Sequence, residues 1–263
     1  MEQAVIWELD QGNSPLVATA IHNGHALRAE VAELVALSES ERLREEDPFT
    51  GQWTGITDTR IIGLRSRFEV DLNRPREKAV YLEPEDAWGL QVWQEKPSKD
   101  VVTRSLIQYD AFYAEVRRLF TELQRNFGRF VVFDLHTYNH RREGPHGPAA
   151  DRELNPEVNI GTGSVDRERW APIVDRFIAD LRTFDFLGRH LDVRENIKFQ
   201  GGQFPRWTHE NFSGSACVLA IEFKKFFMDE WTGQLDPAQR QFEAISRALQ
   251  STVPGVLEEL SKL

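Results

Sequence analysis

Three continuous apolar stretches are the clearest feature of the sequence. They cover residues 16–21, 130–135 and 216–223. A strand that is buried on both faces loses the alternation of apolar and polar positions. The three stretches therefore predict buried strands of a central sheet. Residues 68–72 alternate between apolar and polar side chains, which predicts a shorter strand.

Apolar residues recur with helical spacing in three longer segments, 109–127, 170–184 and 236–249. A period near 3.6 residues places such side chains on one face of a helix. Asp236 and Pro237 suit the N-cap and the first turn of the last helix. Residues 254–263 are expected to add a further turn or two. The order of strands and helices predicts a three-layer α/β/α fold with a mixed central sheet.

The length and composition fit one domain of this kind. The chain has 263 residues, of which 40% are hydrophobic. That is enough for one substantial core, and we expect a single domain over residues 1–263. The formal charge is −10, so the chain lacks the basic surface that nucleic acids or anionic membranes require. A small anionic substrate remains compatible, because it responds to the local field of a pocket.

The sequence contains no segment that marks export or membrane insertion. Residues 1–10 carry acidic side chains and no long apolar run. No stretch approaches the roughly 20 apolar residues that span a bilayer. The single cysteine, Cys217, excludes an internal disulfide framework and is expected in the core. These features predict a cytoplasmic protein.

Metal-binding and catalytic side chains occur where the predicted strands end. His22 follows the first strand, His136 follows the second, and Glu222 lies on the third. Ligands bind at the carboxyl ends of strands in open α/β sheets, so these residues are expected at one edge. Asp134 lies on the same side of its strand as His136. There it could orient the imidazole or form a structural ion pair.

Histidine and carboxylate side chains of this kind are typical of a hydrolytic zinc site. Catalytic zinc binds three protein ligands, usually histidine and carboxylate, and keeps one position for water. A neighbouring carboxylate transfers the proton of that water to the leaving group. Glu222 is the candidate base, because an unpaired glutamate in an apolar strand is costly to bury. The alternative is a glutamate that faces solvent on an edge strand.

Five segments resemble parts of the N-formylglutamate amidohydrolase family, which is related in fold to zinc carboxypeptidases and aspartoacylase. Residues 67–75 look like its Arg-x-x-x-Asp-Leu-Asn-Arg-Pro segment. The others are similar to its Pro-His-Ser-Gly, Asp-Leu-His-Ser, Phe-Lys-Gly-Gly and catalytic-glutamate segments, at residues 21–24, 133–137, 199–202 and 219–222. The resemblance implies a carboxypeptidase-like fold and one Zn²⁺ ion. Mn, Fe and Co share the preference for histidine and carboxylate ligands and are the alternatives.

The resemblance also implies roles for individual residues. Arg67 matches the arginine that polarises the scissile carbonyl and stabilises the oxyanion. Asn73 and Arg74 match the pair that grips the substrate carboxylate, a task for which the planar guanidinium is well suited. Gly201 and Gly202 match a glycine pair in the substrate loop.

The second metal ligand stays open between three residues. The carboxypeptidase pattern His-x-x-Glu has its counterpart in His22-x-x-His25, which makes His25 one alternative. The acidic stretch that contains Glu46 and Asp47 resembles the family's Asp-x-Asp-Trp segment. Asp47 aligns with the second aspartate, and we favour it over Glu46 and His25 as the partner of His22 and His136.

Four positions depart from the family pattern: Ile21, Asn23, Thr137 and Gln200. Gln200 replaces a lysine and removes a positive charge from the substrate loop, which weakens the match to N-formylglutamate itself. Arg141 or Arg142, in the loop 139–148, could help to hold an anion, and an exposed basic loop is the alternative. His209 could line the pocket. The tryptophans, Trp88 among them, are expected as core or loop anchors.

The sequence therefore predicts metal-dependent hydrolysis of an N-acyl amino acid, first of all N-formylglutamate, to formate and the free amino acid. Another N-acyl amino acid or a peptide amide is the enzymatic alternative. A catalytically silent protein that binds carboxylates is the alternative from another class. The expected partner is a small anionic substrate, and the sequence leaves the oligomeric state open.

Overall fold

The computed structural model describes residues 5–236 and 238–263. Its sheet contains the strands β1 (Trp7–Asp10), β2 (Leu16–Ala20), β3 (Thr59–Gly63), β4 (Phe130–Tyr138), β5 (Val158–Gly161), β6 (Val193–Glu195) and β7 (Ala216–Lys224). The spatial order is β1-β3-β2-β4-β7-β5-β6. The four central strands β3, β2, β4 and β7 are parallel to one another. The edge strand β1 is antiparallel to β3, and β5 is antiparallel to β7 but parallel to β6. A separate hairpin joins β8 (Met228–Asp229) and β9 (Gln234–Leu235).

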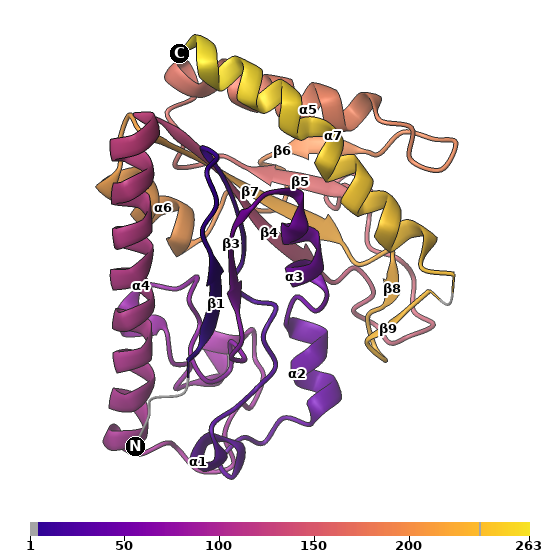
Figure 1. Ribbon diagram of the computed structural model, residues 1–263. Coiled ribbons are helices and arrows are strands. Elements are labelled where there is room, and N and C mark those ends of the chain that lie inside the picture. The colour runs from indigo at the N-terminus through magenta and orange to yellow at the C-terminus, as the bar shows by residue number, and fades with distance from the viewer. Residues whose placement is uncertain (1–4, 237) are drawn as a thin grey trace.

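Helices cover both faces of the sheet (Figure 1). They are α1 (Ala29–Ala32), α2 (Glu39–Glu45), α3 (Thr50–Trp53), α4 (Lys99–Phe127), α5 (Arg167–Thr183), α6 (Gln203–Asn211) and α7 (Arg240–Lys262). The helices α4 and α6 lie on one side, and α5 and α7 lie on the other. The predicted three-layer architecture with a mixed sheet is thereby confirmed. None of the described helices is long and apolar enough to cross a bilayer.

The central strands divide their side chains between two cores. In β4, Val131, Phe133 and Leu135 face α5 and α7, whereas Phe130 and Val132 face α4. Both sets are completely buried, which explains why the predicted strands read as continuous apolar runs.

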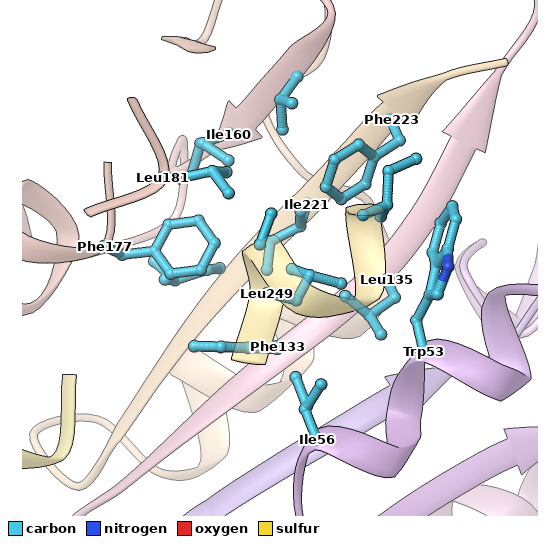
Figure 2. Close-up of a cluster of buried hydrophobic side chains, with 14 of the residues drawn as sticks. Trp53, Ile56, Phe133, Leu135, Ile160, Phe177, Leu181, Ile221, Phe223 and Leu249 are labelled. Carbon is cyan, nitrogen blue, oxygen red and sulfur yellow. The ribbon is translucent and has the colours of Figure 1, made fainter. Parts of the chain in front are cut away.

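Figure 2 shows the first of these cores, where strand residues meet Phe177 of α5 and Leu249 of α7. Trp53 closes it at the end of α3, and its indole N–H donates to the carbonyl oxygen of Phe242. Each large apolar side chain buried in this way contributes roughly 1.5–3 kcal/mol. Cys217 lies buried in this core, as expected.

A third, smaller cluster supports a long connection between β3 and α4. It combines Val31 and Val35 with residues from the connection, including Phe68, Tyr81 and Trp93. Within this connection, the short 3₁₀ helix η3 (Pro84–Ala87) is closed by a capping box between Glu83 and Asp86. The cluster fixes a segment that lies beside the site described below.

One predicted strand is wrong, and one predicted helix begins at another residue. Residues 68–72 form turns, because the polar positions of the alternation do not face water: Glu69 and Asp71 are both completely buried. The last helix begins at Arg240, after Gln239 with φ +49°, so Asp236 is not its N-cap. Pro237 lies outside the described residues. The helix then continues through Pro254 to Lys262, which adds the further turns expected there.

Candidate active site

The parallel strands β2, β4 and β7 bring the polar residues to one edge of the sheet. His136 of β4 lies directly opposite Glu222 of β7 in the strand register. Residues paired across neighbouring strands point to the same face, so these side chains project together. His22 follows β2, which pairs with the other side of β4. The edge predicted from the sequence is therefore present.

Three potential metal-binding side chains converge at this edge. One ligand atom from each of His22, Asp47 and His136 lies within 4.8 Å of the others, and all three residues are buried. The Asp47 Oδ2 atom lies 3.0 Å from Nδ1 of His136 and 3.5 Å from Nδ1 of His22. The Nδ1 atoms of both imidazoles thus face the same carboxylate.

A second carboxylate lies behind each histidine. Oδ1 of Asp71 is 2.7 Å from Nε2 of His22. Oδ2 of Asp134 is 3.0 Å from Nε2 of His136, at ion-pair distance but outside hydrogen-bond direction. Thr19 donates its hydroxyl to the other oxygen of Asp134 at 2.7 Å. Each imidazole is therefore flanked by carboxylates on both nitrogens.

Several bonds fix the loop that carries Asp47. Its backbone N–H donates to the carbonyl oxygen of His22 at 3.0 Å, and Thr137 donates its hydroxyl to Oδ1 at 2.9 Å. The buried Lys225 ammonium donates to the carbonyl oxygens of Arg44 and Glu46. Burial alone would raise the pKa of Asp47, but hydrogen bonds from His136 and His22 hold it well below its ordinary value.

The other two candidate ligands lie outside this group. Glu46 is completely buried, yet its carboxylate contacts Nδ1 of His25 at 2.5 Å and accepts the hydroxyl of Ser66. Arg42 donates to the backbone carbonyl of His25 and approaches Glu46. The acidic stretch is therefore a buried network rather than solvated charge, and Asp47 is its member beside the two histidines.

Glu222 is a carboxylate without a cationic partner at contact distance among the described residues. Burial raises its pKa to about 8, an effect that His136 opposes and that the nearby Asp47 and Asp134 reinforce. At neutral pH without a cation nearby, the carboxyl group thus tends to keep its proton. A bound cation would favour the carboxylate form.

A cavity of about 300 Å³ opens over these residues. Arg67, Asn73 and Arg74 line it together with Glu222 and the metal-binding group. Six basic side chains face the cavity against three carboxylates: Arg44, Arg67, Arg74, Arg142, Arg206 and Lys225 against Glu45, Asp47 and Glu222. The pocket is thus locally basic in a chain with a charge of −10, which favours an anionic ligand.

Arg67 is anchored at the side of the cavity. Its guanidinium donates to Asp71 at 2.8 Å, to the Tyr81 hydroxyl at 3.1 Å and to the Glu45 carbonyl at 3.2 Å. These bonds use three of its five N–H donors, which leaves two for another acceptor. Asp71 also binds His22, so one buried carboxylate connects the potential metal-binding group with the arginine.

The glycine pair lies against Asn73. Oδ1 of Asn73 accepts the N–H of Phe204 at 2.9 Å, which joins the start of α6 to residue 73. A Cβ atom on Gly202 would come within 2.3 Å of the Asn73 side chain. Gly201 has φ +99°, a conformation that favours glycine. This close approach leaves the Asn73 side chain at the cavity wall beside both glycines.

A comparison of the sequence with known proteins identifies a family. The sequence model of the N-formylglutamate amidohydrolase family matches residues 14–227. The chain belongs to this family. No curated protein matches it.

Two solved structures share the fold of this family member. One is an N-formylglutamate amidohydrolase from Ralstonia eutropha JMP134, with a TM-score of 0.71, 16% identity, and coverage of 98% of this chain and 99% of that chain. The other is a gene product from Agrobacterium tumefaciens, with a TM-score of 0.63, 16% identity and coverage of 95% of both chains. At these identities, the likeness supports the fold alone.

Two departures from the family pattern keep their polar function in this amidohydrolase family member. Thr137 replaces a serine and still offers a hydroxyl to Asp47. Asn23 also replaces a serine, and its Oδ1 atom accepts the N–H of Gly51 at 2.9 Å. Gln200 lines the cavity where the family has lysine, so this wall carries one positive charge fewer. Ile21 is simply buried in the core.

Sequence reasoning missed several residues of the site and misplaced others. Asp71 stood inside a matched segment, but its alternation in residues 68–72 suggested a strand and gave it no role. Trp88 was expected as an anchor, yet it is 49% exposed and lines the cavity. His209 does not line it and binds Ser164 and the backbone of β7 instead. Arg142 does line the cavity, whereas Arg141 donates to Gly147.

Proposed function

We propose that this family member is a zinc-dependent amidohydrolase that removes the acyl group from a small N-acyl amino acid, with N-formylglutamate as its first substrate. The observation that carries the proposal is the convergence of His22, Asp47 and His136 beside Glu222 in one basic cavity. The family match supports the amide-bond chemistry.

The donor set suits a zinc ion. Two imidazoles and one carboxylate are typical ligands of catalytic zinc, and they leave a position for water. Metal-binding histidines usually direct their second nitrogen toward a carboxylate, as His22 does toward Asp71. His22, Asp47 and His136 would hold the ion, and the chemistry it supplies is Lewis acidity that lowers the pKa of a water molecule to about 7.

The remaining residues divide the work of hydrolysis. Glu222 takes a proton from the attacking water and delivers it to the departing nitrogen. Arg67 has two free N–H donors and a position fixed by Asp71 and Tyr81, so it can donate to the carbonyl oxygen as negative charge develops there. The C–N bond breaks, and water supplies the oxygen of the released acid.

We assign the α-carboxylate of the substrate to Arg74 and Asn73, which line the same cavity. Arg74 offers a guanidinium and Asn73 a side-chain amide N–H₂ group, beside Gly201 and Gly202. With N-formylglutamate, the products are formate and glutamate. The basic lining of the cavity supports an anionic amino acid over a neutral amide.

Formate release from N-formylglutamate tests this proposal directly. We expect Glu222→Gln to bind metal and substrate but to lose roughly 10²–10⁴-fold in kcat, because the general base is gone. Glu243→Gln, at an exposed position of α7, is the matched control and should keep full activity.

The alternatives give different results in the same assay. A wild-type protein that cleaves other N-acyl amino acids but not N-formylglutamate would change the substrate and keep the mechanism. A protein that binds N-formylglutamate and cleaves no amide would be the silent carboxylate binder. Full activity in Glu222→Gln would remove this residue from its role.

A further inference from the structure

Trp88 forms part of the cavity wall, and the proposed mechanism leaves it without a role. Large aromatic residues are usually buried, yet this side chain is 49% exposed. It follows η3 in the connection between β3 and α4. Residues on both sides of it, Tyr81 and Trp93 among them, are buried in the third core cluster. The indole thus lies between the third core cluster and the polar cavity, with about half of the residue accessible.

The backbone at Trp88 is in the left-handed region, with φ +56° and ψ +27°. Glycine or asparagine adopts this conformation at lower cost than a bulky residue. The surrounding segment enforces it, because the N–H of Gly89 donates to the Pro84 carbonyl at 2.7 Å and η3 is capped by Glu83 and Asp86. A strained aromatic residue at a site points to a function for its side chain.

The ring of Trp88 contacts the two arginines of the proposed substrate site. Cζ of Arg67 lies 4.8 Å from the ring centroid, and Cζ of Arg74 lies 5.9 Å from it. Both distances fall within the range of cation–π interactions. The ring also packs edge-on against Tyr81, whose centroid is 6.0 Å away.

The two arginines depend on this ring to different degrees. Arg67 has three hydrogen bonds that hold its guanidinium without help. The guanidinium of Arg74 makes no hydrogen bond to the part of the chain that the structure describes, and its Nε atom is 4.0 Å from Asp71. Its close neighbours are the faces of Trp88 and Tyr81, both at 5.9 Å. The restraints on the Arg74 guanidinium are therefore the ion pair with Asp71 and the two aromatic faces, of which Trp88 is one.

We propose that Trp88 is a positioning residue for carboxylate recognition: its ring holds the Arg74 guanidinium at the cavity and keeps water from the ion pair that Arg74 forms with the substrate. The inference rests on the proposed function of Arg74 as the carboxylate ligand. An ion pair with less water around it is stronger. A guanidinium that is ordered beforehand also loses less conformational freedom on binding.

Binding measurements in a double-mutant cycle test this role. Calorimetry on the zinc-loaded Glu222→Gln protein gives dissociation constants for N-formylglutamate without turnover. Trp88→Ala is expected to weaken binding by about 3- to 30-fold, the range of one cation–π contact. In the presence of Arg74→Ala, the same change should weaken binding by less than about 2-fold, because the residue through which it acts is gone.

Two further arms separate positioning from a general structural effect. The α-amide of N-formylglutamate keeps the γ-carboxylate but lacks the α-carboxylate that Arg74 is proposed to bind, so its binding should be insensitive to Trp88→Ala. Trp88→Gly removes the ring but suits the left-handed backbone, so it should fold and show the same loss as Trp88→Ala. Trp88→Phe keeps an aromatic face and should restore part of the affinity.

The outcomes distinguish the inference from the proposal beneath it. Equal losses with and without Arg74, or equal losses for the acid and its α-amide, overturn the role of Trp88 alone. No loss in Arg74→Ala overturns the carboxylate site, and the inference fails with it. A further outcome is that the double-mutant cycle gives the expected losses while the wild-type protein releases no formate. That result leaves the role of Trp88 intact and overturns only the proposed reaction.

Discussion

Asp71 is the residue that connects the two halves of the site. Its buried carboxylate contacts Nε2 of His22, the guanidinium of Arg67, the hydroxyl of Tyr81 and the N–H of Asn73. Burial alone would raise its pKa, but Arg67 and His22 hold the pKa well below its usual value. A single ionised side chain thus orients one histidine of the proposed metal site and the arginine proposed to contact the substrate.

The variant Asp71→Asn tests this connection. The change keeps the shape of the side chain and removes its charge, so His22 loses the carboxylate that fixes its ring. We expect zinc affinity to fall by about 10–100-fold, the usual effect of such outer partners. Competition with a chelator measures it. Asp110→Asn, at an exposed ion pair with Arg76, should bind zinc as the wild type does, and an unchanged affinity in Asp71→Asn would contradict the assignment.

His209 gives a pH-dependent prediction away from the metal-binding group. Its Nε2 atom accepts the N–H of Val218 at 3.0 Å, and Nδ1 lies 2.8 Å from the Ser164 hydroxyl. The ring is therefore neutral in the folded protein, and burial lowers its pKa from 6.5 to about 4.

Between these two pH values, the unfolded chain binds the proton and the folded chain does not. The stability contribution of His209 is therefore complete above pH 6.5 and falls by roughly 1.4 kcal/mol for each pH unit as the pH drops toward 4. In His209→Gln this part of the dependence should vanish, whereas in His146→Gln, at an exposed loop position, it should persist. The same pH dependence of the free energy of unfolding in His209→Gln and in the wild type across this range would refute the explanation.

At the scale of elements, neighbouring segments hold the loops that complete the cavity. The loop after β4 supplies Arg142 to the cavity wall. Its backbone N–H groups at His140 and Arg141 donate to the buried Glu230 carboxylate, each at 2.7 Å. Burial would raise the pKa of Glu230, but its bonds to His140 and Arg141 lower it. The segment between β8 and β9, which contains Glu230, thereby fixes a loop that lines the cavity.

Glu230→Gln should loosen this loop. The amide keeps one acceptor oxygen and loses the charge, which we expect to cost about 1–3 kcal/mol of unfolding free energy. Denaturant unfolding measures the loss, and limited proteolysis should show faster cleavage within residues 139–148. Glu243→Gln, at an exposed pair on α7, is the control and should change stability by less than about 0.5 kcal/mol. Equal resistance of the wild type, Glu230→Gln and Glu243→Gln to cleavage would contradict the role of Glu230 in fixing this loop.

At the scale of the whole molecule, the buried strands were the most predictable part. The runs at 16–21, 130–135 and 216–223 became β2, β4 and β7, because strands covered on both faces need apolar residues at every position. Their parallel order then aligned His22, His136 and Glu222. The short strands at the sheet edges, such as β1 and β6, were not predicted because they bury too few side chains to leave a pattern.

The site residues that follow or interrupt an apolar strand could be predicted from the sequence. The site residues whose burial depends on distant parts of the chain could not. Asp71 and Glu69 looked like the polar face of a strand because the sequence does not reveal that both are enclosed. Trp88 looked like an anchor because its positive φ and its contact with two arginines arise from distant parts of the fold. The choice of Asp47 over Glu46 likewise depends on tertiary contacts with His25 and Thr137.

Removal and restoration of the metal tests the central claim most directly. Formate release from N-formylglutamate is measured on one preparation before chelation, after chelation and after addition of one equivalent of zinc, with metal content determined at each step. We predict that activity disappears with the metal and returns in proportion to zinc bound, up to one ion per chain, while His136→Ala recovers neither. Full formate release from protein without bound metal would contradict the account.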